Sequence, residues 1–454
     1  MAETAQDSLT QSYGTNDASS FPDPLKSLIW NAVLEKATDV HLHSVAQGLR
    51  VLHRVDGLIH PRAFLPAAQG RRLLNQLKSA AGLTIVRSFS PLEGQIVWPD
   101  EDMRWEIRVT LTPVRDRESA HLRLLSVPRD EWDMSSLGFC ARDQEGVSSI
   151  VHSPNGLVLI TGATGSGKTT TMYCLASLMD LRTTTTYSIE DPIEFKIPYI
   201  QQIEVDEVHG LTMHEGLRTI LRMDPDLILV GEIRDSDSAL VAARAALAGR
   251  LVLGTIHAQD AAGAIDSLRY LGVPSHVISS SLRLVIAQNL VRRLCPDCSL
   301  PREPRNYEKE LFARHQMEPP ENLWDCGLGA ENGWRMEEGE WKGPEEAKPQ
   351  AEDRGSQSYS CPHCHSYGYQ GRTGIFEVAA LNDELTTLIR TGADQQQLGS
   401  CLRRQGIRSL MEDGLEKVAA GVTSLDELMR VCGRRRLEPL CPDAAPALEE
   451  IVTQ

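Results

Sequence analysis

The sequence predicts an α/β protein with a central parallel-sheet domain, a smaller α+β domain before it, and a C-terminal region that combines a metal site with helices. Three observations predict this class. Apolar strand-like runs alternate with helical stretches over residues 155–294, which is typical of a mostly parallel sheet covered on both faces. A glycine-rich loop follows the first apolar run, at residues 162–169. Two Cys-x-x-Cys pairs follow the last run.

Length and charge limit the functions that the chain can have. Its 454 residues suffice for two or three domains with hydrophobic cores. Its net charge of −16 argues against broad binding to nucleic acid, so we expect no direct nucleic-acid partner. The sequence has no apolar run of transmembrane length and no signal-peptide pattern in its polar first twenty residues. We therefore expect a cytoplasmic protein that associates with a membrane only peripherally, through a partner or a surface.

The first part of the chain predicts a small domain preceded by a loose segment. Residues 1–22 are polar and are predicted to be disordered. Over residues 23–127, amphipathic helical stretches alternate with strand-like runs such as 49–55 and 106–111, which predicts a small α+β domain. Residues 128–154 are predicted to be a linker.

The glycine-rich loop has the chemistry of a phosphate-binding loop. It reads GATGSGKT and lies between an apolar run and a helical stretch. Its glycines let backbone N–H groups point at phosphate oxygens, and the following helix adds the positive end of its dipole. Lys168 is expected to reach the β- and γ-phosphates, and the Thr169 hydroxyl to ligate Mg²⁺. The loop predicts ATP binding in a RecA-like ATPase domain over residues 155–294, by Gly162, Ala163, Thr164, Gly165, Ser166, Gly167, Lys168, Thr169 and Thr170.

Carboxylates follow two further strand-like runs. The apolar run 226–232 ends in Glu232, where a RecA-like sheet places a group beside the metal and the attacking water. Upstream, Glu190, Asp191 and Glu194 surround a proline. Such clusters usually lie on solvated faces, but the position of this one between the loop and Glu232 favours contact with Mg²⁺ or water.

A histidine ends another buried-type strand. The run 251–257 places His257 at the carboxyl end of the strand, the edge at which open α/β sheets bind ligands. Two interpretations stay open for this run alone: His257 senses the γ-phosphate, or it is a hydrogen-bonded histidine of the core.

Four cysteines predict a structural zinc site within a subdomain at 295–373. Each Cys-x-x-Cys pair supplies two thiolates, and four thiolates fill a tetrahedral Zn²⁺ and leave no open position for catalysis. Two unrelated cysteine pairs are the alternative. The ligands would be Cys295, Cys298, Cys361 and Cys364. Residues 305–358, between the pairs, are acidic and rich in Pro and Gly, and predict a flexible or irregular insertion.

The end of the chain predicts helices and then disorder. Residues 374–433 have helical periodicity and are expected to form a small helical subdomain. Residues 434–454 begin with three arginines and continue with Pro- and Ala-rich sequence, which predicts a disordered tail.

Together these motifs resemble the secretion ATPases of type II secretion and type IV pilus systems. The resemblance covers about residues 24–432 and is that of a short, assembly-type member with a four-cysteine zinc subdomain. It rests on the phosphate loop, the acidic cluster, both cysteine pairs and the segments 38–43, 54–57, 224–235, 254–260, 266–269 and 371–377.

The resemblance implies a PAS-like fold for the N-terminal α+β domain. It also implies a homohexamer in which this domain packs on the ATPase domain of a neighbour. Arg108 and Arg123 fall at the family's arginine-finger positions, although on sequence alone both are surface strand arginines in ion pairs. Glu232 would organise the attacking water, with Glu194 assisting. His257 would sense the γ-phosphate. Hydrolysis would drive rotation of an inner-membrane platform protein and the assembly of pilin-like subunits.

Three alternatives stay open. A retraction ATPase would use the same chemistry with the opposite output, but retraction members of the family lack the four-cysteine subdomain that assembly members commonly carry. A DNA-translocating or conjugation-type motor is possible because RecA-like domains also drive DNA, but the acidic charge weighs against it. The third is a catalytically silent scaffold that nucleotide binding controls. The intact Lys168, Thr169 and Glu232 argue against it.

Overall fold

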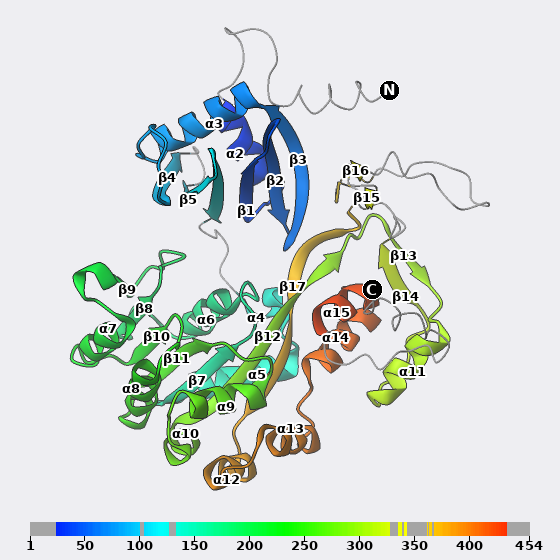
Figure 1. The fold of residues 1–454 in the computed structure, drawn as a ribbon. Coiled ribbons are helices and arrows are strands. Elements are labelled where there is room, and N and C mark those ends of the chain that lie inside the picture. The colour runs from blue at the N-terminus through cyan, green and yellow to red at the C-terminus, as the bar shows by residue number, and fades with distance from the viewer. Residues whose placement is uncertain are drawn as a thin grey trace, which may run out of the picture. The chain divides into compact units, whose positions relative to one another are not determined.

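A computed structural model describes residues 24–99, 104–126, 133–326, 335–337, 340–342, 361, 363–365 and 367–433 (Figure 1). The predicted disordered segments at 1–22 and 434–454 lie outside these residues. Contacts divide the chain into two compact units, one of residues 1–131 with 194–197 and the other of the remainder. None of the described helices is both long enough and apolar enough to cross a membrane.

The first unit is an antiparallel sheet with two helices. Its strand order is β3-β2-β1-β6-β5-β4. Alternate strand residues such as Val40, Leu42, Ile107 and Val109 are fully buried, in one core with the apolar residues of both helices. This confirms the predicted α+β class. The elements are α2 (Pro24–Leu34), β1 (Asp39–Ser44), β2 (Gly48–Val55), β3 (Leu58–Pro66), α3 (Ala67–Ala80), β4 (Leu92–Pro99), β5 (Arg104–Val114) and β6 (Arg117–Ser126).

The second unit is built on a sheet in the order β17-β12-β7-β11-β10-β8-β9. All neighbouring strands are parallel except β17, which runs antiparallel to β12. The central strands β7, β10 and β11 are buried at every residue, as strands covered on both faces must be. The strands are β7 (Gly156–Thr161), β8 (Thr186–Glu190), β9 (Ile200–Glu204), β10 (Leu227–Val230), β11 (Leu251–Ile256), β12 (Leu282–Leu294) and β17 (Tyr369–Ala380).

Helices cover this sheet, and several begin at a side chain that caps the first turn. Thr212, Asp235 and Asp260 each accept a hydrogen bond from the backbone N–H three residues later. The parallel sheet between helices confirms the predicted α/β class. The elements are α4 (Met134–Leu137), α5 (Ala141–Val151), α6 (Lys168–Ser177), the 3₁₀ turn η1 (Glu207–His209), α7 (Met213–Ile220), α8 (Ser236–Leu247), α9 (Ala261–Tyr270) and α10 (Ser275–Ser281).

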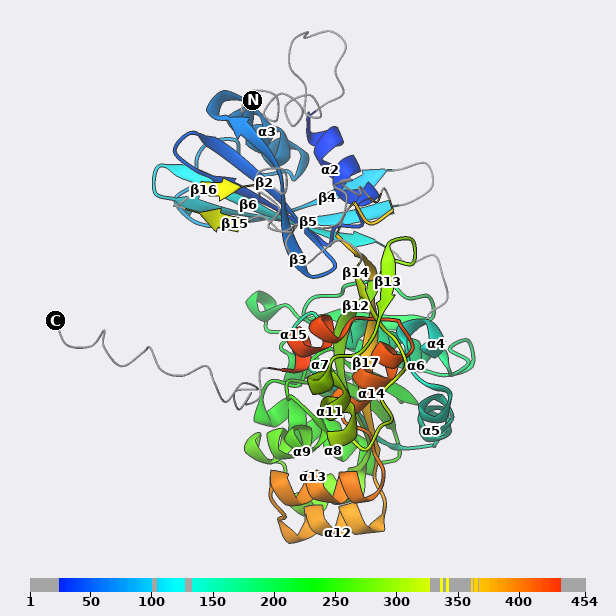
Figure 2. The same cartoon turned by 90° about the vertical axis from the view of Figure 1, so that its right-hand side faces the viewer.

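The C-terminal helices do not share one core. They are α12 (Asp383–Thr391), α13 (Gln395–Arg404), α14 (Leu410–Ala419) and α15 (Leu425–Cys432). Leu385 and Leu398, of the first pair, are buried in the core of the parallel sheet. Leu415 and Leu428, of the second pair, belong to a separate core beside β12 and β17. Figure 2 shows the two pairs at different places on the unit. The expected single helical subdomain is therefore two helix pairs that complete two different cores.

Part of the acidic insertion is ordered, so the prediction of irregular structure was wrong for residues 306–326. This segment holds α11 (Asn306–Arg314) and β14 (Leu323–Cys326), which pairs with β13 (Ser299–Arg302). Phe312 and Leu323 are buried in the same core as α14 and α15. Two apolar anchors are enough to fix a polar segment whose average composition predicts disorder. A short hairpin, β15 (Arg335–Glu337) with β16 (Glu340–Lys342), lies further on.

Candidate active site

The phosphate-binding loop connects β7 to α6 through backbone shapes that require glycine. Gly165 and Gly167 have φ of +78° and +85°, a region that L side chains rarely adopt. A Cβ atom on Gly162 would lie 2.2 Å from the carbonyl oxygen of Gln288. The structure therefore places residues 162–167 in a tight turn, and Lys168, Thr169 and Thr170 in the first turn of α6.

Lys168 extends back over the loop that precedes it. Its Nζ atom donates hydrogen bonds to the carbonyl oxygens of Gly162 and Ala163, at 3.0 and 3.1 Å. The ammonium group thus lies beside the turn whose N–H groups are predicted to bind phosphate. Thr169 and Thr170 are half-buried next to it.

The loop is fastened to the neighbouring strand by Gln288, which the sequence analysis missed. Gln288 lies in β12 and is 2% exposed. Its Nε2 atom donates to the carbonyl oxygen of Ser166 at 2.8 Å, and its Oε1 atom accepts from the Thr171 hydroxyl at 2.6 Å. Two adjacent amide residues, Gln288 and Asn289, interrupt a long apolar run and were the only sequence signal for this contact.

Glu232 and His257 meet at the carboxyl edge of the sheet. They follow β10 and β11, which are adjacent parallel strands. The Glu232 carboxylate contacts the Nε2 atom of His257, and the Nδ1 atom of the same ring lies 3.3 Å from the carbonyl oxygen of Gly162. The structure therefore links the carboxylate, the imidazole and the phosphate loop in one chain of contacts.

Arg234 and Asp191 extend this group and were not singled out for this role. Arg234 Nε donates to the Glu232 carboxylate at 2.7 Å, and its Nη1 atom lies 3.1 Å from Asp191 Oδ2. Glu232 thus lies between an imidazole and a guanidinium, which hold its oxygens in a fixed direction. Arg234 was visible in the sequence only as a charged residue two positions after Glu232.

Glu190 is held by protein groups. It ends β8 and is 2% exposed. Its carboxylate accepts hydrogen bonds from the Tyr173 hydroxyl, from the Ser188 hydroxyl at 2.6 Å and from Gln202 Nε2 at 3.1 Å. These contacts tie β8 to α6 and β9, so Glu190 supports the strand end that carries Asp191.

Three predicted residues belong to the other compact unit, so the site formed within the parallel-sheet unit does not include them. Glu194 is partly buried in the short segment 194–197. Arg108 and Arg123 lie directly opposite each other on the paired strands β5 and β6. Nothing in this arrangement tests their predicted role.

Asp39 organises the surroundings of Arg123. This buried carboxylate accepts hydrogen bonds from His121 Nε2 at 2.9 Å, from the Thr38 hydroxyl at 2.8 Å and from Arg123 Nε at 3.2 Å. Arg54 Nε lies 3.7 Å away. Burial alone would raise the pKa of Asp39, but the hydrogen bonds and the charge of Arg123 hold this pKa well below its usual value. Asp39 is therefore a permanent anion among cationic groups.

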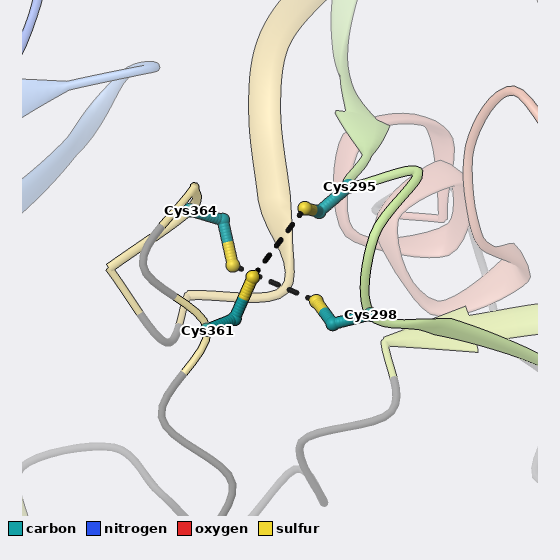
Figure 3. A group of neighbouring side chains, drawn as sticks. All are labelled: Cys295, Cys298, Cys361 and Cys364. Atoms are coloured by element: carbon teal, nitrogen blue, oxygen red, sulfur yellow. Dashed lines mark hydrogen bonds between the residues drawn. The ribbon is translucent and has the colours of Figure 1, made fainter.

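The four cysteines converge as the sequence predicts (Figure 3). Their Sγ atoms all lie within 4.8 Å of one another, with Cys295 and Cys361 at 3.9 Å and Cys298 and Cys364 at 3.6 Å. Thiolates around a tetrahedral zinc with bonds of about 2.3 Å lie about 3.8 Å apart, so the donor set fits Zn²⁺. The backbone N–H of Gly368 also donates to Cys364 Sγ at 3.3 Å, which supports a thiolate there.

The two Cys-x-x-Cys pairs join the end of β12 to the segment that leads into β17. The backbone N–H of Cys295 donates to the carbonyl oxygen of Gly368 at 3.0 Å. Burial raises the pKa of the Cys295 thiol, whereas a backbone hydrogen bond from Cys364 lowers the pKa of the Cys361 thiol to about 7. A bound metal would deprotonate all four thiols.

Comparison with known proteins identifies the family. A profile described as "Type II/IV secretion system protein" matches residues 15–430. The chain belongs to this family. It is 35% identical over 409 residues to the type II secretion system ATPase E of Vibrio cholerae, covering 90% of this chain and 74% of that protein. It is 34% identical over 408 residues to the type IV pilus assembly ATPase PilB of Thermus thermophilus, covering 89% and 42%.

Solved structures share the fold of this secretion ATPase. The ATPase DotB of Legionella pneumophila matches with a TM-score of 0.63 at 18% identity, over 93% of this chain and 98% of that one. The pilus retraction motor PilT matches with a TM-score of 0.55 at 22% identity, over 90% and 97%. The predicted fold and family are confirmed, and the chain is an ATPase as predicted. Membership also implies a bound nucleotide.

Proposed function

We propose that this secretion ATPase is a Mg²⁺-dependent homohexamer that powers assembly of a type IV pilus or a type II secretion pseudopilus. It would act peripherally at the cytoplasmic face of the inner membrane, where hydrolysis rotates a platform protein. The observation that favours assembly over retraction is the converged four-cysteine cluster, because the family resemblance associates this cluster with assembly members. The names of the relatives at 34–35% identity, a secretion ATPase and a pilus assembly ATPase, support the same direction.

The phosphate loop supplies the binding half of the proposed chemistry. Lys168 leaves the loop carbonyls and places its charge on the β- and γ-phosphates, which offer stronger acceptors than neutral carbonyls. The Thr169 hydroxyl would hold Mg²⁺, which when bound would neutralise charge on the phosphates. Gln288 keeps the loop closed around them because it holds Ser166 and Thr171 at once.

Glu232 and His257 supply the hydrolytic half. The Glu232 carboxylate accepts a hydrogen bond from the attacking water and orients it towards the γ-phosphorus. His257 contacts both Glu232 and the loop. A γ-phosphate bound in the loop would therefore move His257, and this movement would change its contact with the Glu232 carboxylate. Arg234 donates a hydrogen bond to this carboxylate and so holds it in one direction. Arg108 and Arg123 of a neighbouring subunit would complete the charge stabilisation.

The test is steady-state ATP hydrolysis by the full chain, with mass measured in the presence and absence of nucleotide. Lys168→Ala is expected to lose nucleotide binding, and Glu232→Gln to bind ATP but turn it over at least about a hundredfold more slowly. The matched controls Lys26→Ala and Glu215→Gln change exposed residues of the same types. Equal turnover by Glu232→Gln and wild type would refute the assignment of Glu232.

A second measurement separates assembly from the rival outputs. Cells that carry the chain with its own platform protein should extend filaments with wild type and fail with Glu232→Gln. Filament shortening driven by the wild-type chain would make it a retraction motor. Hydrolysis stimulated by DNA at moderate salt would revive the nucleic-acid motor.

A further inference from the structure

Two neighbouring loops of the N-terminal unit expose apolar side chains at their tips. In the loop between α3 and β4, Ile85, Val86 and Phe89 are 57%, 75% and 87% exposed. Val114, at the turn between β5 and β6, is 44% exposed. The guanidinium of Arg87 donates to the carbonyl oxygen of Arg115, which joins the two loops. These four side chains form one patch, named here the tip patch.

The tip patch is held in place by a buried ion pair. Lys78 is fully buried and its ammonium contacts both carboxylate oxygens of Glu118, at 2.6 and 2.7 Å. The same carboxylate accepts from the backbone N–H of Ser88 at 3.3 Å, and Lys78 also reaches the carbonyl oxygens of Ile85 and Val86 at 3.5 Å. The pair thus contacts the backbone of the loop at three residues, and these contacts hold the loop in place.

Cationic side chains surround the apolar ones. Arg87, Arg115 and Arg117 are exposed beside the tip patch, and Asp116 is the one acid of the β5–β6 turn. Arg117 lies 3.8 Å from Asp116, while Arg87 lies over the Phe89 ring at 5.4 Å. Arginine is therefore in local excess at these two loops, although the chain as a whole has a net charge of −16.

We infer that the tip patch inserts into an anionic membrane surface. Aliphatic and aromatic side chains on projecting loops, ringed by arginines, fit the boundary between acyl chains and anionic headgroups. The high exposure of Val86 and Phe89 shows that these side chains project outward instead of lining a hollow, which favours a fluid lipid surface over a shaped protein partner. This contact goes beyond the proposed function, in which the membrane is reached through a partner, and does not depend on the ATPase chemistry.

Vesicle flotation of the purified full chain tests the inference. Wild type is expected to float with vesicles of phosphatidylglycerol and phosphatidylethanolamine, and not with phosphatidylcholine alone. The double variant Val86→Ser with Phe89→Ser should weaken binding about tenfold or more, because it removes the inserting side chains. Arg87→Gln with Arg117→Gln should weaken binding about fivefold per arginine and flatten its salt dependence.

Leu34→Ser is the matched control, since Leu34 is 62% exposed on α2 of the same unit and lies outside the tip patch. Circular dichroism and ATP turnover check that each variant is folded. Failure of wild type to float with anionic vesicles overturns the inference, as does equal flotation of the Val86–Phe89 double variant. If that variant instead alters the oligomeric mass while wild type does not float, the tip patch is a contact between subunits and the lipid assignment is wrong.

Discussion

The carboxylate of Asp39 lies 3.2 Å from the Nε atom of Arg123, on the neighbouring strand of the same sheet. This contact holds one edge of the guanidinium, and the Arg123 side chain is half exposed. An arginine held this way is pre-oriented, so less side-chain entropy is lost when it meets a phosphate.

Asp39→Asn should therefore lower ATP turnover in the assembled protein about tenfold if Arg123 serves the site of a neighbour. Arg123→Ala should lower it further, by about a thousandfold. The double variant should be no slower than Arg123→Ala, because Asp39 acts only through that arginine. All three variants should keep the wild-type affinity for ATP and the wild-type hexamer mass. A change in either quantity would indicate misfolding instead of a lost catalytic contact. Full turnover by Arg123→Ala would remove the basis for both predictions.

Gln288→Ala should loosen the phosphate loop. The substitution leaves the Ser166 carbonyl and the Thr171 hydroxyl buried without their partner, which costs about 1–3 kcal/mol. Nucleotide affinity should fall about tenfold, since the loop is no longer held in its binding shape. Fluorescent-nucleotide titration and thermal melts measure the two effects. Gln396→Ala, on the exposed face of α13, should change neither. A normal affinity with a lowered melting temperature would mean that Gln288 only supports the fold.

Cys298→Ser should remove the metal. Wild type is expected to contain about one zinc per chain, and three thiolates do not close a structural site. Elemental analysis measures the metal, and hydrogen exchange should rise around residues 295–302 and 361–371. Cys432→Ser, at a thiol outside the cluster, is the control. Zinc-free wild type, or undiminished zinc in Cys298→Ser, would contradict the assignment.

Stability should depend on pH through Glu377. Burial raises the pKa of this β17 carboxyl to about 7, against the opposing charge of Arg403. The folded state therefore holds the proton more tightly than the unfolded chain, where the pKa is about 4.3. The resulting stabilisation is complete below about pH 4 and is lost as the pH rises through 7.

Glu377→Gln is neutral at every pH, so it should match wild type near pH 4 and exceed it by about 2–4 kcal/mol at pH 8. Urea unfolding across this range gives the comparison. The exposed Glu310→Gln on α11 should follow wild type throughout. A difference that does not grow with pH would show that Arg403 keeps Glu377 ionised.

The sequence predicts the parallel sheet and its phosphate loop because both depend on local patterns. Fully apolar runs mark strands buried on both faces, and the glycines of residues 162–167 mark a turn that other residues cannot adopt. Likewise the Cys-x-x-Cys spacing predicts a ligand set, although the two pairs are far apart in the sequence. The strand-end positions of Glu232 and His257 were enough to predict that both lie at one edge.

The contacts that fasten the site were missed because they join distant segments through single polar residues. Gln288 is one of two adjacent amide residues in a largely apolar stretch of β12, and nothing in its neighbours indicates that it contacts Ser166. Asp39 pairs with Arg123 only because β1 lies beside β6, a pairing that periodicity does not specify. Residues 306–326 of the acidic insertion were misjudged for a related reason, since Phe312 and Leu323 share a core with α14 and α15.

The strand β12 reaches from the phosphate loop to the cysteine cluster. Gln288 lies within it, and Cys295 directly follows its last residue. In an extended strand, seven residues span about 23 Å and cannot be shortened without breaking the ladder of hydrogen bonds to β17. The metal centre thus lies at the far end of a strand that belongs to the nucleotide-binding sheet. It cannot be excised or transplanted as a separate module, because any cut that frees it also removes an edge of the ATPase.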